Sequence, residues 1–197
     1  MDQLTGALKW NSVDLKYIMV KNSDGLKDVV LLLDPIGHVR DIEHLEIVRK
    51  AQGLNLNLLV ILPEIKAEVG SHVEPLSESF SFACSNLGLE SPVLIGSGYA
   101  ALAIIVSLVN RKVGSSGFIA ISPEYSEGIF SLLYRIEEPV WYIYGRGGPV
   151  EEERVMFRYH DLTAGSRLVK ISGNARDIFV ERPSQFISLL ADYLDHV

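Results

Sequence analysis

The sequence predicts an α/β fold: a doubly wound, mostly parallel sheet of about seven or eight strands that forms a single domain over residues 1–197. Six short runs rich in Val, Ile and Leu alternate with helix-like segments along the chain. The runs are apolar nearly throughout, which is typical of parallel strands buried on both faces. A chain of 197 residues, 48% of them hydrophobic, can bury one sizeable core but hardly a second domain.

The order of the elements follows from these runs. The six runs cover residues 28–34, 57–62, 92–97, 117–122, 139–145 and 166–172. Helices are expected over residues 40–52, 76–87, 99–110, 126–135, 151–161 and 183–194. Residues 7–25 differ, because they hold two strand-like runs separated by turn residues, with no room for a crossover helix. That pattern predicts an antiparallel hairpin at the edge of the sheet.

Charge and cysteine content argue against several classes of protein. Eighteen basic and 25 acidic side chains give a net charge of -7, so the chain lacks the basic surface of a nucleic-acid-binding protein. The single cysteine, Cys84, suits a reducing compartment and a place in the core. The apolar stretch 91–110 is split by Gly96 and Gly98, and the N-terminus does not resemble a signal peptide. We therefore expect a cytoplasmic protein without a membrane span, and no metal or cofactor, because the histidines show no metal-ligand spacing.

A glycine-rich turn, "VLIGSGYAA", joins the third run to a helix. Ligands in open α/β sheets bind beyond the carboxyl ends of the strands, so this turn is a candidate site. Gly96, Gly98 and Ala101 match the G-x-G-x-x-A of dinucleotide-binding turns, with Glu124, after the next run, as a candidate ribose ligand. Ser97 is a second candidate, either as a nucleophile or as a residue whose hydroxyl only binds the backbone at the helix start.

The C-terminal third carries a resemblance to a known family. "PVWYIYGRGGPV" followed by "AGSRLVKISGNARDIFVERPSQFISLLADYL" resembles the closing strands of the α/β-hydrolase family. With the edge hairpin and with "VLIGSGYAA" as the nucleophile turn, the resemblance extends over almost the whole chain. It implies an α/β-hydrolase-like fold without a cap domain, because only residues 123–138 separate the fourth and fifth runs.

The resemblance also implies that the three positions of the catalytic triad lack the groups that catalysis needs. The nucleophile position falls on Gly98, the acid on Gly148 or else Gly147, and the histidine on Arg176. Arginine stays charged at physiological pH and cannot relay a proton. Asp34 stands where the family's oxyanion loop begins, and a carboxylate there would repel a developing oxyanion. We expect Asp34 and Arg176 to form an ion pair in the vacated crevice.

These features predict a catalytically inactive or impaired α/β-hydrolase-like protein that binds a small molecule or another protein. The expected crevice residues are Asp34, Ser97, Tyr99, Tyr125 and Arg176. One alternative shifts the turn by one residue and makes Ser97 the nucleophile of an esterase-like hydrolase with His38 as the base. Another is a dinucleotide-binding domain that uses Gly96 and Gly98. A homo-oligomer is left open, since Ile129, Phe130, Leu132 and Leu133 could pack on the sheet or form a contact between copies.

Overall fold

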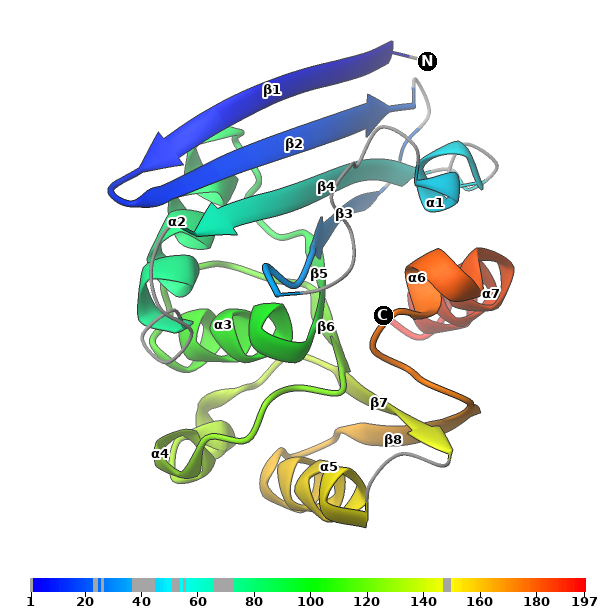
Figure 1. The fold of residues 1–197 in the computed structure, drawn as a ribbon. Helices are drawn as coiled ribbons and strands as arrows, with labels where there is room; N and C mark the ends of the chain where they lie inside the picture. The colour runs from blue at the N-terminus through cyan, green and yellow to red at the C-terminus, as the bar shows by residue number, and fades with distance from the viewer. Residues whose placement is uncertain are drawn as a thin grey trace.

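The structure is a computed structural model that describes residues 2–22, 25, 27–36, 45–50, 54, 56–65, 73–146 and 150–197. It contains one eight-stranded sheet in the order β1-β2-β4-β3-β5-β6-β7-β8, with helices on both faces (Figure 1). The strands are β1 (Asp2–Trp10), β2 (Val13–Lys21), β3 (Lys27–Leu32), β4 (Leu56–Ile65), β5 (Val93–Ser97), β6 (Gly117–Ile121), β7 (Val140–Arg146) and β8 (Arg167–Ser172). The helices are α1 (Glu46–Lys50), α2 (Val73–Asn86), α3 (Gly98–Val109), α4 (Glu127–Phe130), the 3-10 helix η2 (Leu133–Arg135), α5 (Val150–Leu162), α6 (Ile178–Glu181) and α7 (Pro183–Leu194).

The sheet confirms the predicted fold class. Strands β3 to β8 run parallel to one another, whereas β2 runs antiparallel to both β1 and β4. The predicted edge hairpin is β1 and β2, joined by a two-residue turn in which Asn11 has a φ of 51°. Asparagine tolerates this left-handed conformation, which the tight turns of hairpins require.

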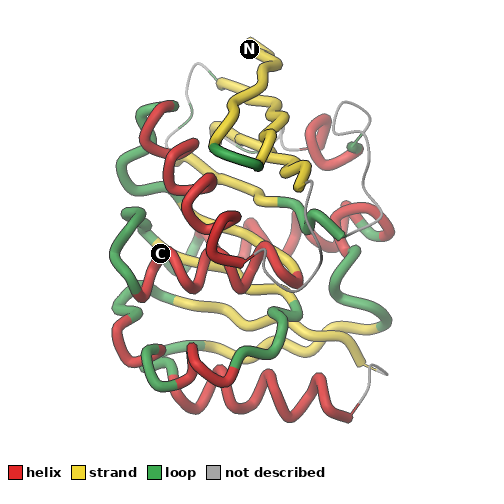
Figure 2. Tube along the Cα trace, turned by 60° about the vertical axis from the view of Figure 1, so that its left-hand side comes forward, coloured by secondary structure: helices red, strands yellow, loops and turns green. Residues whose placement is uncertain are grey.

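Each face of the sheet has its own hydrophobic core, so that the strands form the middle layer between two layers of helices (Figure 2). Residues that alternate along a strand point to opposite faces. In β5, Leu94 therefore packs on the side of α2, α3 and α5, while Val93 and Ile95 pack on the side of α1, α6 and α7. Cys84 of α2 is buried in the first core, which confirms the place in the core that the sequence predicted for it.

Three local expectations were wrong. The helix expected over residues 126–135 is interrupted, because α4 ends at Phe130 and η2 follows after a turn. The short helix α6 was not predicted. The run in β8 is not buried on both faces, because β8 is the outermost strand, and Ile171 is its one buried residue. Of the helix expected over 40–52, only 45–50 are described, and they contain α1.

Between β6 and β7 the chain forms only α4, η2 and short turns, and within residues 73–146 no cap domain is inserted. Ile129, Phe130 and Leu133 are buried and pack on the core rather than facing solvent. Among the described residues, none of the helices has both the length and the apolar character that a membrane span requires.

Candidate functional site

The segments that follow four of the parallel strands meet at the carboxyl edge of the sheet. Asp34 follows β3, Gly98 follows β5, Glu124 follows β6, and Arg176 follows β8. The chain leaves β3 toward β4 on one side and returns to β5 on the other, so the point between β3 and β5 is where the strand order reverses. In open α/β sheets this is the place where ligands bind.

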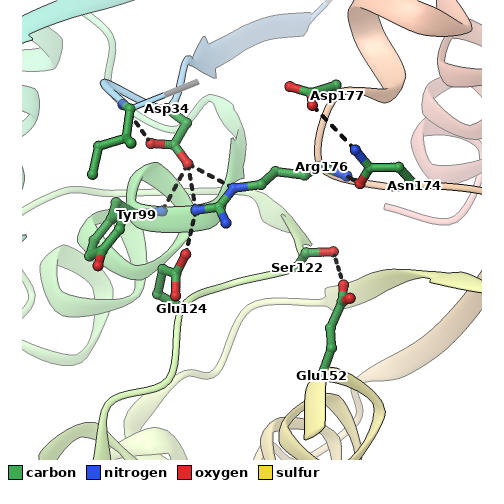
Figure 3. Close-up of polar contacts among 9 residues, drawn as sticks. Asp34, Tyr99, Ser122, Glu124, Glu152, Asn174, Arg176 and Asp177 are labelled. Carbon is green, nitrogen blue, oxygen red and sulfur yellow. Dashed lines mark hydrogen bonds and ion pairs between the residues drawn. The ribbon is translucent and has the colours of Figure 1, made fainter. Parts of the chain in front are cut away.

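The structure brings Asp34 and Arg176 together across 142 residues of sequence (Figure 3). The guanidinium donates from Nε and from Nη2 to Oδ2 of Asp34, over 3.0 Å and 2.8 Å. Its Nη2 also donates to Oε1 of Glu124, which lies on the opposite side of the guanidinium. Burial disfavours the charged form of Arg176, but attraction to Asp34 and Glu124 outweighs it, and the pKa of the guanidinium lies above its ordinary value.

The carboxylate of Asp34 is buried, with 4% of the side chain exposed, and its oxygens accept further hydrogen bonds from the backbone. Oδ1 accepts from the N–H of Ile36 over 3.0 Å, and Oδ2 accepts from the N–H of Tyr99 over 3.4 Å. Tyr99 lies in the first turn of α3, where the helix dipole favours a negative charge. A helix N-terminus, a loop N–H and a guanidinium thus hold one carboxylate in place.

Gly98 lies directly beside this ion pair. It has a φ of 55°, a left-handed conformation that strains residues bearing a Cβ. A Cβ added at Gly98 would overlap Oδ2 of Asp34 and Nη2 of Arg176, and would lie 2.6 Å from Nε of Arg176. The space above this turn is therefore filled by the two charged groups.

Ser97 points elsewhere. As the residue after Gly96 in β5 it belongs with Val93 and Ile95, on the face opposite α3. Only 1% of its surface is exposed, and its hydroxyl has no hydrogen-bond partner among the described residues. The alternative in which this hydroxyl binds the backbone at the helix start is wrong, because Ser97 makes no side-chain cap at α3.

A cleft of about 350 Å³ opens beside Arg176. Its wall includes Glu124, Tyr125, Glu152, Asn174 and the hydroxyl-bearing Ser122. Ser122 has a φ of 43° and donates from Oγ to Oε1 of Glu152 over 2.6 Å, which ties the loop after β6 to the first turn of α5 (Figure 3). Tyr125 is 55% exposed at the rim, and its hydroxyl donates to Glu127.

Sequence reasoning missed two of these contacts. Glu124 was considered only as a ribose ligand, whereas it binds Arg176. The pair of Ser122 and Glu152 was not considered at all. The available signal for both was position, because Ser122 and Glu124 directly follow a strand end at the same edge of the sheet as Asp34.

Two other expected site residues, His38 and Gly148, lie outside the described residues, as does Gly147. Among the residues that the structure does describe, no group of histidine, cysteine or acidic side chains is arranged to hold a metal ion.

Solved structures share this fold over nearly their whole length. A predicted CIB-like hydrolase from Thermoplasma acidophilum has a TM-score of 0.81 at 14% sequence identity, with 100% of both chains covered. An enol-lactonase from Burkholderia xenovorans LB400 has a TM-score of 0.79 at 11% identity, over 96% of this chain and 100% of the other. The carboxylesterase CesB from Bacillus subtilis has a TM-score of 0.73 at 12% identity, over 98% and 92%.

No protein-family model matches the sequence, and a search of curated proteins found no match. Identities of 14% or less carry the fold and nothing finer. The TM-scores and the coverage agree with the resemblance that the sequence motifs indicated, and the chain has the α/β-hydrolase fold.

Proposed function

We propose that the protein is a catalytically inactive α/β-hydrolase-like protein that binds a small molecule in the cleft beside Arg176. The observation that carries the proposal is the occupied space above Gly98. In the frame that the family resemblance implies, a nucleophile's side chain would begin at this position. Here the Asp34–Arg176 ion pair fills the space where such a side chain would start.

The charges around the turn support the same conclusion. Arg176, at the position of the histidine in that frame, is held in its charged form by two carboxylates and has no proton to exchange near neutral pH. Asp34 places a negative charge where an acyl-transfer enzyme would stabilise an oxyanion. Both features work against ester hydrolysis at this site.

The size and charge of the cleft support a small ligand that is not an anion. A volume of about 350 Å³ lies within the range of small-molecule sites. Glu124, Glu151 and Glu152 line the cleft, with Arg176 as its one cationic residue among those described. Neutral or cationic ligands are therefore favoured, and the pyrophosphate of a dinucleotide is disfavoured.

The alternative hydrolase that uses Ser97 remains a prediction, and so does the dinucleotide-binding domain. The buried position of the Ser97 hydroxyl is unfavourable for attack on a substrate, although the fold is compatible with a hydrolase. A protein partner in place of a small molecule is likewise a prediction.

The decisive experiment treats the protein with a fluorophosphonate probe and with p-nitrophenyl esters, beside the variant Ser97→Ala. Neither labelling nor ester hydrolysis is expected above the level of the variant. Labelling that disappears in Ser97→Ala would overturn the proposal in favour of the hydrolase.

Binding is tested separately by a thermal-shift screen of primary amines, neutral acyl amides and esters, and nicotinamide and flavin dinucleotides. A stabilising amine, amide or ester should lose its effect in Tyr125→Ala, at the rim of the cleft. It should keep its effect in Tyr134→Ala, where an exposed tyrosine lies outside the cleft lining. Stabilisation only by dinucleotides, or equal losses in both variants, would contradict the assignment of the cleft.

A further inference from the structure

The strand β1 forms an edge of the sheet with its outer side open (Figures 1 and 2). It is nine residues long and pairs with β2 along its whole length. Within the part of the chain that the structure describes, no further strand lies beyond it. An edge of this length offers a row of backbone N–H and C=O groups to another strand.

The register of the hairpin fixes which residues supply that row. Trp10 and Val13 flank the two-residue turn and form a mutually hydrogen-bonded pair, so every second residue of β1 bonds to β2. The residues between them, Gln3, Thr5, Ala7 and Lys9, direct their backbone groups outward. A hydrogen bond farther into the sheet agrees with this register. When the same alternation is continued through β2 into β4, the carbonyl of Ile61 must face β3, and this carbonyl does accept a hydrogen bond from the N–H of Leu33 over 2.9 Å.

The chemistry of this edge does not prevent pairing. Sheet edges are commonly blocked by proline or by charged side chains, particularly lysine. At the opposite edge, β8 carries Arg167 and Lys170 within six residues. Residues 3–8 of β1 contain neither charge nor proline, and Leu4 is 53% exposed on the same face as the half-buried Leu8.

We propose that two copies of this chain pair through β1 in antiparallel orientation, about a two-fold axis at Gly6. This register places Thr5 opposite Ala7 and Gln3 opposite Lys9 of the second copy, so all four outward residues are used. It gives about eight backbone hydrogen bonds between the copies. It also sets Leu4 opposite Leu8, which continues the apolar face of β1 across the axis.

The charges of β1 are compatible with a second copy at this edge. The chain carries a net charge of -7, but β1 holds one acidic and one basic residue, Asp2 and Lys9, at its two ends. Antiparallel pairing brings the Asp2 end of each strand beside the Lys9 end of the other. The contact uses the same surface on both copies, so it closes at a dimer and leaves no β1 edge open.

The first test measures mass by sedimentation velocity for the wild-type chain and for Ala7→Pro. Proline at an outward-facing edge position removes no bond to β2 but takes away a bridging N–H. Ala7→Pro should be a folded monomer, whereas the matched control Ala7→Val, which keeps the N–H, should remain a dimer. A wild-type chain that is monomeric up to about 0.1 mM would overturn the proposal. A folded Ala7→Pro dimer, or a series of larger species, would do the same.

The second test needs no proline and reads the register directly. Gln3→Glu faces Lys9 of the other copy with the opposite charge, and Gln3→Lys faces it with the same charge. Because each pair occurs twice, dimerisation should tighten roughly fivefold in Gln3→Glu and weaken roughly fivefold in Gln3→Lys. Repulsion between two acidic chains alone would give the reverse order. Equal dissociation constants for the two variants, or that reverse order, would refute the register.

Discussion

Substitution of Gly98 by alanine tests whether the Asp34–Arg176 pair occupies the space above the turn. The chain supplies matched controls, because Gly88 and Gly165 have φ values of 69° and 68° but no atom within 4 Å of an added Cβ. All three glycines share the backbone penalty of a left-handed residue. Only Gly98 adds the overlap with the two charged groups.

The expected magnitudes follow from these two contributions. At the controls, the left-handed backbone should lower the free energy of unfolding by about 1 kcal/mol. Removing one partner of a fully buried ion pair costs about 3–5 kcal/mol. Arg176 is 35% exposed, and Asp34 keeps the N–H of Ile36, so separating this pair should cost about 2 kcal/mol. Gly98→Ala should therefore lower the free energy of unfolding by about 3 kcal/mol in all. Its loss exceeds that of the controls by about 2 kcal/mol, which places its Tm about 4–8 °C below theirs.

The assay is urea unfolding followed by tryptophan fluorescence, with Gly98→Ala, Gly88→Ala and Gly165→Ala measured side by side. The same substitution at Gly98 in an Asp34→Ala, Arg176→Ala background separates the two contributions, because the overlapping groups are then absent. The extra cost at Gly98 should vanish in that background. If Gly98→Ala loses no more stability than Gly88→Ala, the reasoning about the occupied space is refuted.

Three further predictions concern single side chains. Arg176→Gln should lower the free energy of unfolding by about 2 kcal/mol. Adding Asp34→Asn should restore at least half of this loss, because no buried carboxylate is then left unpaired. If urea unfolding shows that the losses of the two substitutions add, the prediction is contradicted. Ser97→Ala should be neutral or stabilising by up to about 1 kcal/mol, because it removes a buried hydroxyl that has no partner among the described residues, and a clear loss of Tm would point to a bond of that hydroxyl. Burial raises the pKa of the Cys84 thiol to about 12, so a thiol reagent at pH 8 should modify it only after unfolding, and rapid modification of the native protein would disprove its burial.

The sequence was sufficient to locate the parallel strands. The runs at 92–97 and 117–122 differ by at most one residue per end from β5 and β6, because strands buried on both faces must be apolar at nearly every position. Helix 126–135 failed for the opposite reason. The spacing of its apolar residues fits a continuous helix, but the same residues also reach the core from a short helix followed by a 3-10 helix. The spacing alone does not distinguish these two arrangements.

The candidate site, too, could be predicted from the sequence only in part. The family resemblance assigned Asp34 and Arg176 to the same crevice, and the structure brings them within 2.8 Å. The third partner, Glu124, could not be assigned from the sequence, since its contact with Arg176 depends on how the loops after β6 and β8 approach each other. The direction of Ser97 was readable in principle, because strand alternation puts it on the face of Val93 and Ile95.

On the proposed function, a nucleophile at position 98 and the Asp34–Arg176 pair are alternative occupants of one space. A side chain at residue 98 must displace a carboxylate held by two backbone N–H groups and a guanidinium. Gly98→Ser should therefore be less stable and still resist fluorophosphonate labelling, because Arg176 cannot deprotonate the new hydroxyl. On this reasoning, activity at this turn requires linked changes at residue 98, at Asp34 and at Arg176. Labelling of the single variant Gly98→Ser would contradict the reasoning, because it would show that a side chain at residue 98 can displace the ion pair.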